Sequence, residues 1–195
     1  GITISKEQLK FAKDRAKKLG IEDKVELLFC DYRDLDGQFD KIVSIEMIEA
    51  VGHQYLPVYF GKLQSLLTKQ GLLVIQAITS PDARYDEFRK GVDWIQKHIF
   101  PGSLLPSVAA MTEAVKKSGD MHLVNLRDIG THYAKTLKLW REDFNKEWLN
   151  ITPLGFDEKF KRKWNYYLSY CEAAFEMRNI SDVQLTWSRP NNTSF

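Results

Sequence analysis

The feature that most constrains the fold is a series of short apolar runs separated by segments of helical periodicity. The runs cover residues 25–30, 39–45 and 71–78. The first, at 25–30, is nearly continuous in apolar residues, which is typical of a strand buried in a parallel sheet, and the other two also read as strands. Between the second and third runs, residues 53–68 carry apolar side chains at helical spacing. Strands that alternate with helices predict an α/β fold with a parallel sheet.

A further helix is predicted close to the start of the chain. Ser5 is a candidate N-cap, with Gln8 at the distance expected of a capping box. Apolar residues follow at helical spacing, and Gly20 suits the left-handed conformation that commonly ends a helix. Residues 1–79 therefore resemble the middle of a doubly wound α/β domain.

The pattern changes after the third apolar run. Residues 80–118 contain no strand candidate, and Pro81, Pro101 and Pro106 divide them into two or three helical pieces. This segment is too long for a plain connection, and long excursions of this kind usually cover a site. We therefore expect a helical cap here.

Strands and helices are also predicted in the last third of the chain. Residues 121–128 and 183–188 alternate between apolar and polar side chains, as strands do. Residues 133–148 and 156–177 form aromatic-rich amphipathic helices. Packing in the core is one explanation for these aromatic rings, and lining a site is the other.

The composition indicates a globular protein without a nucleic-acid partner. The apolar fraction is 44%, and the formal net charge is only +2. No apolar run approaches the ~20 residues that a membrane-spanning helix needs. Cys30 and Cys171 lack the spacing of a metal site, so we expect no metal and a reduced, cytoplasmic setting.

Several polar residues follow the predicted strands, and ligands of open α/β sheets bind beyond the carboxyl ends of strands. Asp31 follows the first apolar run, Glu46 and Glu49 follow the second, and Gln76 lies near the end of the third. If the turn after the second strand is helical, Glu46 and Glu49 share a face, and one could act as a base or orient an anion. Solvated carboxylates are the alternative. A G-x-G-x-x-G loop, which would identify a nucleotide site, is absent from the sequence.

Five motifs occur in order along nearly the whole chain. They are D-Y-R-D at 31–34, M-I-E-A-V-G at 47–52, F-P-G-S-L-L-P-S at 100–107, H-Y-A-K-T-L-K-L-W at 132–140 and Y-Y-L-S-Y-C at 166–171. Together they resemble the cyclopropane-fatty-acyl-phospholipid synthase family, which includes the mycolic acid cyclopropane synthases. The segment 1–8 is similar to the part of these enzymes that follows their second strand.

The resemblance implies a class I S-adenosylmethionine-dependent methyltransferase with a Rossmann-like sheet. Residues 1–195 would form a partial domain, with a lid or acyl-binding insertion at about 80–118 and aromatic helices at about 129–178. In the cofactor site, Thr3 and Gln8 would line the ribose and methionine side, and Asp31 and Tyr32 would hold the adenine. The family's glycine-rich loop belongs upstream of Gly1, so this chain alone is expected to bind the cofactor weakly and to be inactive.

The resemblance also implies a set of catalytic residues. Glu49 would help to hold a bicarbonate ion, the general base in this family, and Tyr133 would reach the same anion pocket. Cys171 would lie nearby, with packing as its alternative role. Gln76 stands where the family often has a histidine. Glutamine can bond an anion but cannot carry its proton, so methylation without ring closure becomes an alternative.

The family's substrates define the expected reaction and partners. The enzyme would transfer a methyl or methylene group to the double bond of an unsaturated phospholipid acyl chain. We expect transient peripheral contact with the inner face of the plasma membrane and no nucleic acid, and a homodimer is a further option. Methylation of a small amine and a non-catalytic lipid-binding fragment are the competing hypotheses.

Overall fold

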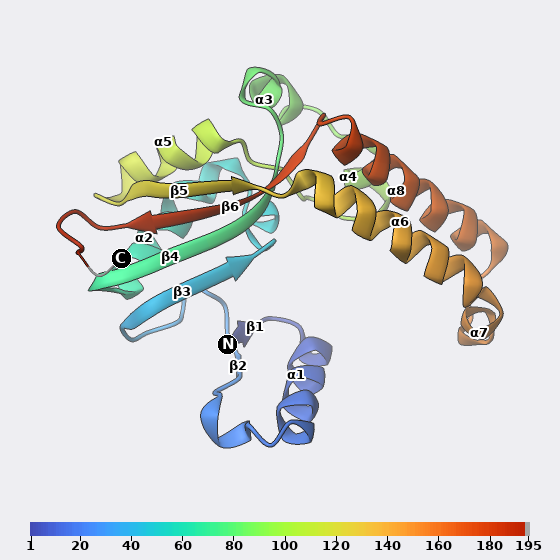
Figure 1. The fold of residues 1–195 in the computed structure, drawn as a ribbon, viewed down its shortest axis with the longest axis horizontal. Coiled ribbons are helices and arrows are strands. Elements are labelled where there is room, and N and C mark those ends of the chain that lie inside the picture. Colours follow the sequence, from blue (N-terminus) through green and yellow to red (C-terminus); the bar gives the residue numbers. More distant parts are fainter. Residues whose placement is uncertain (194–195) are drawn as a thin grey trace. The chain divides into compact units, whose positions relative to one another are not determined.

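Two short strands and one helix build the N-terminal unit of the computed structural model, which describes residues 1–193 (Figure 1). Its elements are β1 (Ile2–Thr3), α1 (Lys6–Lys18), a 3₁₀ turn (Glu22–Lys24) and β2 (Leu28–Phe29). β1 and β2 pair in parallel, with Ile2 opposite Leu28. This unit spans Gly1–Phe39, and a second compact unit begins at Asp40.

Helix α1 begins and ends as the sequence predicts. The hydroxyl of Ser5 accepts a hydrogen bond from the Gln8 backbone N–H at 3.2 Å, and Gly20 adopts a left-handed φ of 63°. Only one of the two hydrogen bonds of the predicted capping box forms, because the Gln8 side chain does not bond to the Ser5 N–H. The Gln8 side chain accepts a 2.7 Å hydrogen bond from the Thr3 hydroxyl, which in turn accepts one from the Ser5 N–H.

The buried strand predicted at residues 25–30 is also wrong. The observed strand comprises Leu28 and Phe29 alone, and these side chains are 36% and 54% exposed. Within the described residues, β1 pairs with these two residues alone, so the hydrogen-bonded ladder covers only part of the apolar run.

The second unit contains a four-stranded sheet with the order β3-β4-β6-β5. The strands are β3 (Phe39–Ile45), β4 (Leu67–Thr79), β5 (His122–Asp128) and β6 (Ser181–Ser188). The strands predicted from residues 39–45, 71–78, 121–128 and 183–188 are thereby confirmed. Glu46, directly after β3, donates its N–H to the Gln76 carbonyl near the end of β4. These two strands therefore end at the same edge of the sheet.

The sheet is mixed rather than parallel, which corrects the expectation from the sequence. β6 pairs antiparallel with both β4 and β5. Helix α6 (Gly130–Lys146) follows β5, and α8 (Glu158–Glu176) precedes β6. The two helices lie side by side: α6 leads away from the sheet, and α8 leads back to it (Figure 1). Because the chain returns to the end of the sheet that it left, β6 runs in the direction opposite to β5.

Helices cover one face of this sheet. Helix α2 (Leu56–Leu66), preceded by a 3₁₀ turn (His53–Tyr55), replaces the helix predicted over 53–68, whose last residues begin β4 instead. The Phe60 ring of α2 contacts the Trp187 ring of β6 at 5.8 Å between centroids. On β4, Leu73 and Ile75 point to this face and are fully buried. The opposite face carries Gln76 and the polar residues of β6.

The segment 80–118 contains three helices, within the two or three predicted. They are α3 (Asp82–Phe88), α4 (Trp94–His98) and α5 (Val108–Ser118). A short helix, α7 (Trp148–Ile151), and a 3₁₀ turn (Thr152–Leu154) join α6 to α8. Within residues 1–193, no helix has both the length and the apolar character required to cross a membrane.

Candidate functional site

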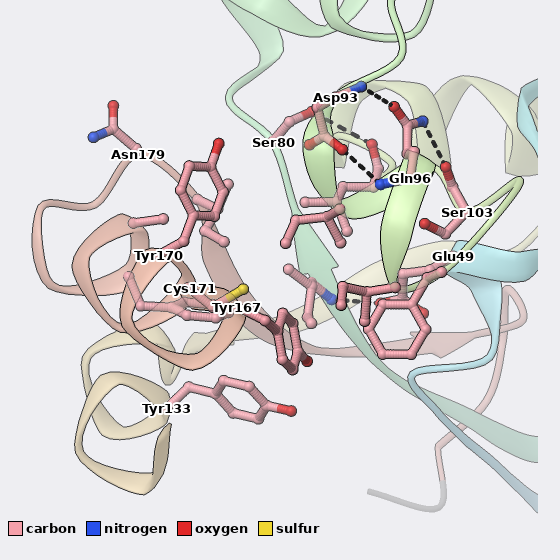
Figure 2. Close-up of a pocket in the computed structure, with 18 of the residues that line it drawn as sticks. Glu49, Ser80, Asp93, Gln96, Ser103, Tyr133, Tyr167, Tyr170, Cys171 and Asn179 are labelled. Carbon is pink, nitrogen blue, oxygen red and sulfur yellow. Dashed lines mark hydrogen bonds between the residues drawn. The ribbon is translucent and has the colours of Figure 1, made fainter. Parts of the chain in front are cut away.

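A cavity of about 1460 Å³ lies within the second unit (Figure 2). The ends of β3 and β4, the segment 80–105 and helices α6 and α8 border it. Its wall is mostly apolar and aromatic. The polar and reactive side chains in the wall include Glu46, Glu49, Tyr133, Tyr167 and Cys171. Cavities of this kind suit apolar ligands that are oriented by a few polar groups.

Glu46 lies directly after β3, at the acidic end of the cavity. Its φ of 50° is unusual for a residue with a side chain. One carboxylate oxygen accepts a 2.9 Å hydrogen bond from the Gln76 amide, and the other accepts a 3.1 Å bond from the Tyr133 hydroxyl. The side chain is therefore held by two donors, one for each oxygen.

Glu49 lies in the 3₁₀ turn Ile48–Ala50 and is 8% exposed. One of its carboxylate oxygens accepts a 2.7 Å hydrogen bond from the Ile78 N–H. Its other oxygen is buried and has no partner within residues 1–193. Burial raises the pKa of Glu49 to about 7. The expected helical face shared with Glu46 is wrong, because Glu46 is left-handed and the turn begins only at Ile48.

Two residues of β6 complete the polar cluster. Asp182 is fully buried and accepts a 3.0 Å hydrogen bond from the Gln76 amide. Gln184 donates to the Gln76 side-chain carbonyl at 3.0 Å. Burial, together with the Glu46 and Glu49 carboxylates, raises the pKa of Asp182 to about 7. Three carboxyl groups thus gather at one end of the sheet.

Tyr133 and Cys171 come to the cavity from α6 and α8. Figure 2 shows the rings of Tyr133 and Tyr167 extending from these helices toward the side of the cavity where Glu49 lies. Burial raises the pKa of Cys171 to about 12, so this side chain is a neutral thiol near pH 7. Its environment therefore agrees with packing better than with nucleophilic chemistry.

Hydrogen bonds hold the segment between α4 and α5 against the turn that follows β3. Asp93 and Gln96 form a capping box at the start of α4, and the Gln96 amide also donates to the Ser103 carbonyl at 2.7 Å (Figure 2). Leu104 then donates its N–H to the Glu49 carbonyl at 2.8 Å. These bonds fix the apolar segment 99–105 along one side of the cavity.

The residues proposed for the cofactor lie in the N-terminal unit. Thr3 ends β1 and bonds to Gln8, while Asp31 and Tyr32 follow β2. All are near the carboxyl ends of two parallel strands, the usual place for a nucleotide. Arg33 bonds both oxygens of Asp31 and lowers the pKa of that carboxyl to about 2. A permanently charged acceptor of this kind fits the hydroxyls or the amine of a nucleoside.

The proposed bicarbonate fits these residues poorly. The Tyr133 hydroxyl and the Gln76 amide, two donors that would hold the anion, already bond to the Glu46 carboxylate. A further donor at this end of the cavity, the Ile78 N–H, bonds to Glu49. A further anion would lie beside three carboxyl groups, where its charge is unfavourable. The Glu46 carboxylate, which has the same O–C–O geometry as the anion, already accepts from the first two of these donors.

The structure brings Glu49, Tyr133 and Cys171 to the wall of one cavity. Gln76 is hydrogen-bonded to Glu46, which also lines that cavity. Their catalytic roles stay predictions. Sequence reasoning missed Asp182 and Gln184. Their alternation with apolar residues in β6 was a signal for a strand, but it equally describes polar side chains that face solvent. Within the described residues, no group of three or more potential ligands is arranged to hold a metal ion.

Comparison with known proteins identifies close relatives. A family model described as mycolic acid cyclopropane synthetase matches residues 1–185. Tuberculostearic acid methyltransferase UfaA1 of Mycobacterium tuberculosis is 44% identical over 188 residues, which cover 96% of this chain and 44% of that protein. Cyclopropane-fatty-acyl-phospholipid synthase of Escherichia coli K12 is 37% identical over 193 residues, covering 97% and 47%. The chain therefore spans slightly less than half the length of these curated relatives.

Solved structures share the fold. Mycolic acid cyclopropane synthase CmaA1, in a complex with SAH and CTAB, matches with a TM-score of 0.81 at 25% identity, over 97% of this chain and 69% of that one. The cyclopropane synthase MmaA2 from Mycobacterium tuberculosis also matches with a TM-score of 0.81, at 24% identity and the same coverage. The predicted α/β fold of class I methyltransferases is thereby confirmed.

Proposed function

We propose a function for this chain from one premise: the chain belongs to the mycolic acid cyclopropane synthetase family. The family inferred from the motifs is thereby confirmed. The chain would form part of an S-adenosylmethionine-dependent methyltransferase that modifies an unsaturated phospholipid acyl chain. The observation that carries the proposal is the large, mostly apolar cavity with the Glu46 and Glu49 carboxyl groups at the ends of β3 and β4. An acyl chain is long and apolar, and its double bond can be oriented against these carboxyl groups.

The cavity wall suits the charge that such a reaction develops. When bound, S-adenosylmethionine supplies an electrophilic methyl group on a sulfonium. An alkene that accepts this methyl becomes a cation on the acyl chain. Phe100 and Tyr167 lie in the wall with ring centroids 5.8 Å apart, and Tyr133 also faces the cavity. Aromatic faces stabilise a cation, and apolar walls exclude the water that would trap it.

Loss of a proton completes the reaction, and we infer that Glu46 accepts it. Glu46 lines the cavity and is partly exposed to it, and each carboxylate oxygen keeps lone pairs beyond the single bond that it accepts. The free oxygen of Glu49 is buried, which makes Glu46 the more accessible of the two carboxylates. Removal of a proton from the new methyl group would close a cyclopropane ring.

Methylation without ring closure is the second candidate. Gln76 stands at the position of the family's usual histidine and cannot relay a proton, so Glu46 alone would accept it, and the carbon that loses the proton decides between the two products. One relative, at 44% identity, is named as a tuberculostearic acid methyltransferase. Proton loss from a neighbouring carbon, rather than from the methyl group, would leave an alkene in the product.

The two outcomes differ in the product. The full-length protein, meaning this chain with whatever residues adjoin it in its gene, is incubated with S-adenosylmethionine and vesicles of a monounsaturated phospholipid. Fatty-acid methyl esters are then analysed by mass spectrometry. A gain of one methylene with loss of the alkene supports cyclopropanation, whereas a retained alkene supports methylation alone. Unmodified lipid together with turnover of small amines would contradict a lipid substrate.

The substrate class also implies where the enzyme acts. Because phospholipid chains reside in bilayers, we infer transient, peripheral contact with the inner face of the plasma membrane. The net charge of +2 is too small for strong attraction to anionic lipid. Sedimentation of the full-length protein with vesicles would test this: weak binding is expected, and tight binding that resists salt would contradict it.

A further inference from the structure

We propose that Asp182 is a positioning residue, which together with Gln184 fixes the Gln76 amide so that the Glu46 carboxylate is held at the cavity. The inference rests on the proposed function, in which Glu46 accepts a proton. It adds to that function a residue of β6, which lies outside the five motifs that resemble the family.

The register between β4 and β6 places these side chains together. Gln76 lies opposite Gln184, and Ile78 lies opposite Asp182. Residues two apart on a strand point to the same face, so Asp182 and Gln184 flank the Gln76 side chain. One reaches Gln76 directly across the ladder, and the other reaches it diagonally.

The Gln76 amide has a single orientation that satisfies its neighbours. Its nitrogen has two hydrogens, and these go to Glu46 at 2.9 Å and to Asp182 at 3.0 Å. Its oxygen accepts from the Gln184 amide at 3.0 Å. A flipped amide would turn its oxygen toward two carboxyl groups and its nitrogen toward another N–H donor. Asp182 and Gln184 therefore exclude the flipped arrangement.

The free-energy cost of burying Asp182 argues against a purely structural role for this residue. Asp182 is fully buried, and one of its oxygens has no hydrogen-bond partner within residues 1–193. From the surrounding elements it faces Glu46, Glu49, Asp128 and Tyr133. Burial beside these carboxylates is unfavourable, and an apolar residue would serve the core better. Strongly perturbed carboxyl groups of this kind concentrate at functional sites.

Without an acceptor at position 182, one N–H of Gln76 loses its partner. The amide can then rotate away from Glu46, whose carboxylate keeps only the Tyr133 hydroxyl as a donor. The Glu46 side chain would sample orientations in which it does not reach the acyl chain. The expected consequence is a lower kcat with little change in KM, since the apolar wall that binds the chain is unaffected.

The test compares three variants of the full-length protein. Asp182→Leu removes the acceptor and should lower kcat about tenfold or more, with KM within about twofold of the wild type. Asp182→Asn keeps an acceptor oxygen, so kcat should stay within about threefold of the wild type. Asp128→Asn removes a nearby charge that does not contact Gln76, and should leave both constants unchanged.

A readout independent of turnover comes from NMR of the Gln76 side-chain amide, assigned by its absence in Gln76→Leu. Both amide protons should exchange slowly in the wild type and in Asp182→Asn, and faster in Asp182→Leu. Should Asp182→Leu not fold, Gln184→Leu replaces it, because this change removes the hydrogen bond that the Gln76 side-chain oxygen accepts.

The outcomes separate the two proposals. A folded Asp182→Leu with unchanged kcat and unchanged amide exchange would overturn the positioning role. An equal loss in Asp182→Asn would also overturn it, because charge rather than the hydrogen bond would then matter. A wild type that modifies no lipid refutes the proposed function, and the amide exchange still decides whether Asp182 fixes Gln76.

Discussion

Glu46 combines an unfavourable backbone conformation with a central place in the polar cluster. A left-handed φ costs a residue with a side chain roughly 1 kcal/mol or more. Its hydrogen bonds to Gln76 and Tyr133 hold the residue there despite this cost. Strain at such a position is a common sign of function.

Glu46→Gly should therefore abolish turnover at little cost in stability. Glycine relieves the backbone cost of about 1 kcal/mol, which partly offsets the two lost hydrogen bonds, so the free energy of unfolding should fall by no more than about 1–2 kcal/mol in urea denaturation. The loss of the carboxylate should remove lipid methylation. Arg178, which is exposed and has a φ of 53°, provides a matched control. Arg178→Gly should gain up to about 1 kcal/mol and keep full activity, because its side chain is exposed. Full activity in Glu46→Gly would remove this residue from the mechanism.

The two raised pKa values predict how stability depends on pH. Burial raises the pKa of Asp182 and of Glu49 to about 7, from ordinary values of 3.8 and 4.5. At pH values between the ordinary pKa and the raised pKa of each group, the folded protein binds more protons than the unfolded chain. The free energy of unfolding should therefore fall as pH rises from about 4 to about 7.

Asp182→Asn tests this dependence, because asparagine does not titrate. Urea denaturation at pH 5 and pH 8 should show a smaller loss of stability in the variant than in the wild type. The difference should be on the order of 2–3 kcal/mol, because the folded pKa of about 7 lies about two pH units above pH 5. An identical loss in both proteins would show that Asp182 does not hold a proton in the folded state.

At the scale of elements, the start of α6 packs closely against β6. A Cβ atom added at Gly130 would lie 2.6 Å from the Ser181 hydroxyl and 3.2 Å from the Asp182 nitrogen. Gly130→Ala should therefore destabilise the protein by about 1–3 kcal/mol. In the middle of α2, a Cβ at Gly61 would meet only the Ser118 side chain at an ordinary 3.6 Å. Gly61→Ala should instead gain up to about 1 kcal/mol, because alanine favours a helix. Thermal denaturation measures both, and equal effects would contradict the packing argument.

The elements themselves were predictable to different degrees. The spacing of apolar residues predicted β3, β5, α6 and α8, because an element that packs on one face repeats that face in its sequence. The same reasoning failed for residues 25–30, where an apolar run is largely exposed. A run of apolar residues predicts a strand only where a partner pairs with it, and β1 pairs with Leu28 and Phe29 alone.

At the scale of the whole molecule, the chain holds its candidate cofactor residues in the N-terminal unit and its acidic cavity in the second unit. The sequence lacks a G-x-G-x-x-G loop, whose backbone and following helix would hold the nucleotide. We therefore expect this chain alone to bind S-adenosylmethionine at least about tenfold more weakly than the full-length protein. Isothermal titration calorimetry measures the two dissociation constants. Equal constants would show that residues 1–195 contain a complete cofactor site.

The sequence by itself determined the family and most helices and strands, because motifs and apolar periodicity are local properties of the chain. It also identified Glu49 and Tyr133 as candidates, since each stands in a family motif, and Gln76, since it stands where the family often has a histidine. Only the tertiary structure decided the mixed sheet and the cluster around Gln76. Gln76 and Asp182 are 106 residues apart and meet through the register of β4 and β6. That register depends on the packing of the entire second unit, which periodicity between near neighbours cannot encode.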